Sequence, residues 1–188
     1  MRAYRSAVYV ATFVLAVASL TAGAPTLAAQ GGAKASSVPV EEARFEPARG
    51  LLRTLVGRWR FEIRFAGNFD GAPDASGTRV LEALFDDMHL QWTEELDHSQ
   101  IKSQGIIGFD ARNGRFYGSS VSSAGSGAEF LTGTMDPAEP LVTFSPVAPS
   151  PGPGRTLMES FTLSMLDPDH FTWAPLDRGW RAVFTREH

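Results

Sequence analysis

Alternation of apolar and polar residues, the pattern of a half-buried β-strand, dominates the chain from Arg58 onward. Its clearest instance is Arg58–Phe65, where two phenylalanines, a tryptophan and an isoleucine alternate with three arginines and a glutamate. A strand with this period places its apolar side chains against a core and its charged side chains in solvent. Arg58–Phe65 is therefore predicted to be a strand with one face on the core.

Further short segments of strand character follow at intervals of about a dozen residues, separated by turn-forming residues. They are Thr78–Phe85, Met88–Leu96, Gln100–Phe109, Arg115–Val121, Glu129–Met135, Leu141–Ser145, Thr156–Leu166, Phe171–Ala174 and Trp180–Thr185. The Asn113-Gly114 pair predicts a tight hairpin between two of them. A series of strands without intervening helices predicts an all-β fold. Because full closure removes exposed sheet edges, we expect an antiparallel up-and-down barrel of eight to ten strands.

The N-terminal region has the three parts of a secretory signal. Arg2 and Arg5 precede an uncharged, mostly apolar stretch of 14 residues, Ala7–Leu20, and small residues follow up to Ala28 and Ala29. An ordinary spanning helix needs about 20 apolar residues, so we predict a cleaved signal peptide at 1–29 rather than an anchor, although an uncleaved anchor helix is the alternative. No membrane span is expected after its removal, and the predicted localisation is periplasmic or secreted.

Residues 30–46 are rich in glycine, serine and charge and are predicted to form a flexible linker. The segment Pro47–Val56 can form a short helix with three leucines on one face, which Gly57 would end. The predicted barrel domain is 47–188.

The amino-acid composition excludes several kinds of functional site. Hydrophobic residues make up 43% and charged residues 20%, a globular balance, and the absence of cysteine excludes disulfides, lipoprotein acylation and thiolate metal sites. The net charge of −4 gives no reason to expect nucleic acid binding. No glycine-rich phosphate-binding motif is present. We expect no cofactor.

Two sets of motifs carry a resemblance to known proteins. Gly57-Arg58-Trp59 opens the first strand, and Arg186 lies near the end of the last. This arrangement resembles the calycin superfamily of lipocalin-like barrels, which implies that the Arg186 guanidinium covers the Trp59 indole and closes one end of the barrel. Such a cation–π contact is worth about 0.5–2 kcal/mol.

The segment 51–186 also resembles an uncharacterised bacterial family, domain of unknown function 1579. The resemblance rests on Leu55-Val56-Gly57-Arg58-Trp59, Ser76-Gly77-Thr78, the run from Gly105 to Asp110, and Phe184-Thr185-Arg186, whereas Asp86-Asp87-Met88 departs from an expected glycine-rich turn. It implies a barrel and transfers no catalytic residue.

The candidate site residues are those that would line a barrel interior. The apolar ones are Trp92, Tyr117, Phe130, Met158 and Trp173. Glu94, on the apolar face of its strand, and Arg186 are candidate polar anchors. The same aromatic residues would equally serve a filled core.

Histidines offer two alternatives that we do not favour. A metal site of His89, Glu95 and His170 is conceivable, and His170 is a conceivable axial ligand for haem. Isolated histidines on polar strand faces or in turns are usually solvated, so no metal ligand is assigned.

The sequence thus favours an exported barrel that binds a small apolar or amphipathic molecule of unknown identity. One alternative is an enzyme acting inside the barrel, with Glu94 as acid or base. Another is a filled structural or interaction module. An interior cavity above about 300 Å³ separates the first two from the third. The sequence leaves the oligomeric state open.

Overall fold

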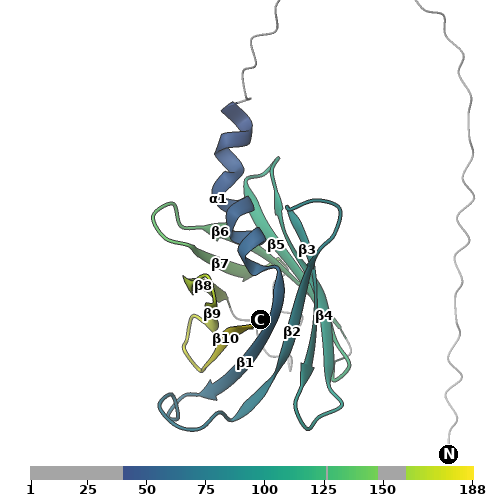
Figure 1. Ribbon diagram of the computed structural model, residues 1–188, viewed down its shortest axis with the longest axis vertical. Helices are drawn as coiled ribbons and strands as arrows, with labels where there is room; N and C mark the ends of the chain where they lie inside the picture. Colours follow the sequence, from purple (N-terminus) through teal and green to yellow (C-terminus); the bar gives the residue numbers. More distant parts are fainter. Residues whose placement is uncertain (1–39, 126, 148–159) are drawn as a thin grey trace, which may run out of the picture. The chain divides into compact units, whose positions relative to one another are not determined.

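The computed structural model describes residues 40–125, 127–147 and 160–188. One helix is followed by ten strands (Figure 1). The elements are α1 (Val40–Leu55), β1 (Gly57–Phe65), β2 (Ala75–Ala83), β3 (His89–Leu96), β4 (Lys102–Asp110), β5 (Arg115–Ser122), β6 (Ala128–Met135), β7 (Leu141–Pro146), β8 (Phe161–Asp167), β9 (His170–Pro175) and β10 (Trp180–Glu187).

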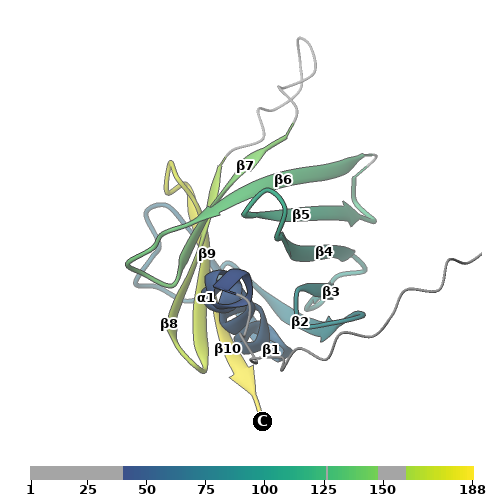
Figure 2. The same ribbon diagram turned by 90° about the horizontal axis from the view of Figure 1, so that it is seen from above.

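The ten strands form a closed antiparallel barrel in simple meander order. Each strand pairs with the next along the chain, and β10 pairs with β1 over eight residue positions, from Arg58 opposite Glu187 to Phe65 opposite Trp180. Figure 2 shows the barrel from the end at which α1 lies. The all-β barrel predicted from the alternating pattern is confirmed, and the described strands lie within three residues of their predicted ends, except that β8 begins at Phe161. The predicted start of that strand, Thr156, lies outside the described residues.

The helix begins earlier than the sequence predicted. It starts at Val40, so residues 40–46, which were assigned to a linker, belong to α1, and Pro47 lies inside the helix. Proline fits the first turn of a helix, where its missing N–H group needs no partner. Here the helix continues through it, at the cost of one backbone hydrogen bond, and the Ala, Glu and Arg residues that precede it are helix-forming types.

The core lies where α1 meets the barrel. Leu52 and Leu55 of α1 are fully buried, as are Trp59 and Phe61 of β1 and Phe184 of β10. Phe184 stacks on Phe171 with ring centroids 4.2 Å apart, and the ring centroid of Phe61 lies 5.4 Å from that of Phe184. Burying each such side chain stabilises the fold by about 1.5–3 kcal/mol.

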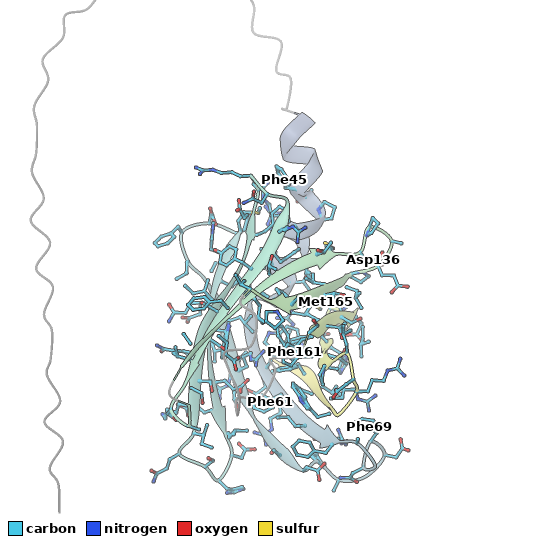
Figure 3. The ribbon with its side chains drawn as sticks, turned by 180° about the vertical axis from the view of Figure 1, so that it is seen from behind. Phe45, Phe61, Phe69, Asp136, Phe161 and Met165 are labelled. Atoms are coloured by element: carbon cyan, nitrogen blue, oxygen red, sulfur yellow. The ribbon has the colours of Figure 1, made fainter. Side chains whose placement is uncertain are left out.

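The two ends of the barrel differ. Phe45 of α1 lies at one end, and Phe69, in the turn between β1 and β2, lies at the other (Figure 3). Arg49 and Arg53 of α1 bind Asp87 in the turn between β2 and β3, with 3.1 Å between Arg49 Nε and Asp87 Oδ1. These ion pairs fix the helix against the strand ends that it covers.

Arg186 closes the helix end of the barrel. Its guanidinium carbon lies 4.1 Å from the centre of the Trp59 ring, so the contact implied by the calycin resemblance is present. Trp59 Nε1 in turn donates a hydrogen bond of 2.8 Å to the Leu55 carbonyl. Gly57 has φ +137°, and a Cβ there would lie 2.7 Å from Arg186 Nη1, so both the backbone and the space require glycine.

The same guanidinium also satisfies carbonyl oxygens at the end of α1. Nη1 donates to Val56 at 2.8 Å and Nη2 donates to Thr54 at 2.6 Å, while Nε donates to the Asp169 carboxylate at 3.1 Å. A cation at the C-terminus of a helix is favourable because the last carbonyls lack partners within the helix. One side chain therefore joins the helix end, the first strand and the last strand.

We expect Arg186→Met to destabilise the protein by about 2–4 kcal/mol, because it removes the cation–π contact and leaves carbonyl groups without donors. Urea denaturation followed by tryptophan fluorescence measures this. Arg58→Met is the matched control: Arg58 forms an exposed ion pair with Glu187 on the same pair of strands, and its loss should cost at most about 1 kcal/mol. Equal costs for the two substitutions would contradict the role given to Arg186.

A second ionic contact, on the outer face, predicts an effect of pH. The pKa of Asp97 is lowered from its usual 3.8 to about 2, first because Arg60 donates hydrogen bonds to it and second because Ser76 does. A carboxyl group whose pKa is lower in the folded state stabilises the fold above its unfolded pKa, and that stabilisation is lost as pH falls from about 4 to about 2. In Asp97→Asn, the urea midpoint should therefore fall less steeply over this pH range than in the wild type. Parallel curves would show that the contact does not form.

Candidate binding cavity

The barrel encloses a cavity of about 380 Å³. Its inner end is formed by Leu55, the last residue of α1, and by the buried Phe171. Ser122 and Gly125 at the β5–β6 turn and Trp180 at the start of β10 line its other end. Because β1 begins directly after α1 and alternate strand ends meet at the same rim, these residues lie at the end away from the helix. The cavity is thus closed beneath α1 and reaches the opposite mouth of the barrel.

The cavity walls differ in side-chain size. Strands β4 and β5 contribute Ser103, Gly118, Ser120 and Ser122, which occupy little volume. Strands β7 to β10 contribute an aromatic wall of Phe144, Phe161, Trp173 and Trp180. Figure 3 labels Phe161, which lies between Phe45 at one end of the barrel and Phe69 at the other.

Two glycines explain why space remains inside. A Cβ on Gly105 would lie 2.6 Å from Trp92 Cζ2, so glycine there allows the indole to lie flat against the wall. A Cβ on Gly118 would meet its nearest atoms, Ile106 O and the Leu131 side chain, at 3.7–3.9 Å, which is ordinary van der Waals contact. The wall at Gly118 therefore carries no side chain although a small one would fit there.

An ion pair lies within this mostly apolar interior. Arg79 of β2 and Glu94 of β3 are directly opposite in the strand register, and both side chains are more than four-fifths buried. Arg79 Nε donates to Glu94 Oε2 at 2.8 Å, and Nη2 donates to the same oxygen. A charge can occupy an apolar interior only when it is paired in this way.

Aromatic rings hold the guanidinium of Arg79. Its central carbon lies 4.7 Å from the ring centres of both Trp92 and Phe184, and 5.9 Å from that of Trp173. Cation–π contacts with several rings fix the plane of the guanidinium and supplement the ion pair. Arg79 is therefore a rigid part of the wall.

The charge of the cavity is nearly balanced. Besides Arg79 and Glu94, Glu129 is the one other ionisable side chain that the described residues contribute to the lining. Glu129 is exposed and accepts a hydrogen bond of 2.9 Å from Ser120 Oγ. The interior proper thus carries one positive and one negative charge in contact.

The structure brings together some of the residues that the sequence proposed and separates others. Trp92, Glu94 and Trp173 line the cavity. Tyr117 and Phe130 do not. On β5 the inward positions are those of Phe116 and Gly118, so Tyr117 points outward, and the neighbouring Phe130 is 57% exposed on the outer face.

Tyr117 has a different environment. It lies against Gly108, with its ring centre 6.1 Å from that of His89, and burial raises the pKa of its hydroxyl group. Arg186 also lies outside the cavity lining, because its guanidinium is held at the helix end. Met158 lies outside the described residues. Of the two candidate polar anchors, only Glu94 therefore lines the cavity, and its partner there is Arg79.

Sequence reasoning missed Arg79. The available signal was strand parity, because Arg79 lies two residues from both Gly77 and Leu81 and so shares their inward face. An arginine in a strand resembles a solvated residue, and only the register with β3 shows that a carboxylate faces it. The contact of Arg79 with Glu94 thus depends on the register between β2 and β3, which neither strand's own sequence gives.

The alternative metal site is not assembled. His89 Nδ1 lies 2.7 Å from Asp86, and His170 Nδ1 lies 2.9 Å from Asp167, each within its own turn. Glu95 instead binds Lys102 at 2.6 Å. Over the part of the chain that the structure describes, no three metal-binding side chains come together.

Comparison with known proteins identifies the family but assigns no activity. No curated protein matches the chain. A family model described as a protein of unknown function, DUF1579, matches residues 45–174, which include the end of α1 and nearly all of the barrel through β9. The chain belongs to this family.

Proposed function

We propose that the protein binds a small apolar or amphipathic molecule inside the barrel. The observation that supports this is the cavity of about 380 Å³, which exceeds the lower limit of about 300 Å³ typical of ligand sites. Its aromatic wall offers dispersion contacts, while Arg79 and Glu94 supply the few polar groups that orient a ligand. This combination is characteristic of small-molecule sites.

The cavity argues against a filled structural module, because a volume of about 380 Å³ inside the barrel is not occupied by side chains. Catalysis by Glu94 is also less well supported. Its contact is with an arginine, which stays protonated in proteins and cannot exchange a proton with it. Binding is therefore the function that the geometry supports best.

The proposal includes a relationship to the calycin superfamily. The meander order of the strands and the contact of Arg186 with Trp59 support it. In barrels of this size the interior either is filled by side chains or holds one small ligand, and the cavity favours the second case.

The proposal also includes export. The sequence pattern of residues 1–29 supports it, and within the described ranges no helix is long and apolar enough to cross a bilayer. We expect the protein purified from its own cells to begin at Ala29 or Gln30. Intact-mass measurement of periplasmic and culture-medium fractions checks this, and recovery of the chain with Met1 in the cytoplasm would contradict export.

Ligand binding is tested with N-phenyl-1-naphthylamine, a neutral apolar probe whose fluorescence rises in apolar surroundings. We expect the wild-type protein to bind one equivalent, and Gly118→Leu to weaken binding by at least about tenfold because the new side chain enters the cavity without a backbone clash.

Thr132→Leu is the matched control. Thr132 lies between the inward residues Leu131 and Gly133 of β6 and so faces outward, and its replacement should change the dissociation constant by less than about twofold. Equal weakening by both substitutions, or failure of the wild type to bind, would contradict binding in the barrel. Native mass spectrometry of the purified protein provides an independent check, since a copurified molecule should disappear in Gly118→Leu.

A further inference from the structure

We propose that the cavity selects an electrically neutral ligand whose polar group accepts a hydrogen bond, such as an alcohol or an amide joined to an apolar body. This inference rests on the proposed binding function and assigns its ligand class. The ion pair of Arg79 and Glu94 imposes the selection.

The first step concerns the hydrogen-bonding capacity that the pair leaves over. Arg79 uses Nε and Nη2 on a single oxygen of Glu94, Oε2. Among the described residues, Arg79 Nη1 and Glu94 Oε1 make no hydrogen bond, and neither is sealed from solvent. Because both residues line the cavity, the pair leaves one donor group and one acceptor oxygen unused in the cavity wall.

The second step concerns rigidity. The rings of Trp92 and Phe184 hold the guanidinium at 4.7 Å each, so the free Nη1 has a fixed direction. A donor held in this way is preorganised and favours a ligand whose acceptor occupies one defined position. A hydroxyl or amide group can accept from Nη1 and donate to Oε1 at the same time.

The third step concerns charge. Glu94 already neutralises Arg79, so an anionic ligand beside Nη1 would bring a second negative charge close to Glu94 in a poorly solvated interior. A cationic ligand beside Oε1 would meet Arg79 in the same way. A neutral ligand leaves the pair intact and loses no charge hydration on entry.

The experiment compares ligands of equal chain length, namely 1-decanol, decanoate and decylamine, as competitors of N-phenyl-1-naphthylamine at about pH 7, where the acid and the amine are charged. In the wild type we expect 1-decanol to bind at least about tenfold more tightly than either charged ligand. Because an uncharged chain also partitions better into any apolar site, this ranking alone does not support the inference.

Variants of the pair separate the two explanations. Glu94→Gln leaves Arg79 without its counter-charge, so decanoate should bind at least about tenfold more tightly than it binds to the wild type, with little change for 1-decanol. Arg79→Gln should favour decylamine in the same way. In the double substitution, which leaves no unpaired charge, neither charged ligand should gain. Glu82→Gln is the matched control, because Glu82 is an exposed carboxylate of β2 outside the cavity lining and its loss should shift decanoate binding by less than about threefold.

Circular dichroism and probe binding show whether each variant is folded. If Glu94→Gln does not fold, Glu94→Ser, which leaves space for water beside Arg79, takes its place. The inference is overturned if decanoate binds the wild type as tightly as 1-decanol, or if the ranking is the same in all folded variants. Failure of the probe and of all three ligands to bind would instead refute the proposed function.

Discussion

The contact of Arg186 with Trp59 and the last carbonyls of α1 is the interaction on which the rest of the barrel depends. It joins the last strand to the first and to the helix that precedes it. A meander of ten strands would otherwise have two free edges, and closure supplies partners for both. The same contact positions the end of α1, so that Leu55 forms the inner end of the cavity. Arg186 therefore reinforces the closure made by the pairing of β1 with β10 and positions one end of the cavity.

The interior of the barrel is filled by side chains near α1 and holds a cavity farther from it. Near α1, large side chains such as Trp59, Phe61 and Leu52 are fully buried and fill the barrel. Farther from the helix, Gly118 and serines replace them on one wall, and an ion pair replaces apolar residues between the walls. Removing a paired charge from water costs free energy that a hydrophobic pair of similar volume would not cost. Its presence beside an open space is easier to explain by recognition than by stability.

The sequence predicted the fold well because strand alternation and turn residues are local signals. It also located Trp59 and Arg186, through their place at the two ends of the barrel motif. It did not locate the partner of Glu94, because that depends on the register between β2 and β3. Tyr117 and Phe130 were chosen as aromatic residues without regard to parity, and a shift of one position exchanges the two faces of a strand. The early start of α1 was missed because Pro47 fits a first turn better than a helix interior.

The residues that close the barrel and the ion pair of the cavity are neighbours in the sheet. The first strand carries Trp59 at the closed end, and its neighbour β2 carries Arg79 directly opposite Trp59 in the register, while Arg79 faces Glu94 of β3 on its other side. Strand β10 likewise carries Arg186 at the closed end and Phe184 against the Arg79 guanidinium. The aromatic cluster that stabilises the closed end therefore also fixes the polar group that faces the cavity. Under the proposed binding function, a change in ligand preference can arise from the walls near the mouth, such as Ser103 or Trp180, without disturbing the contact that closes the barrel.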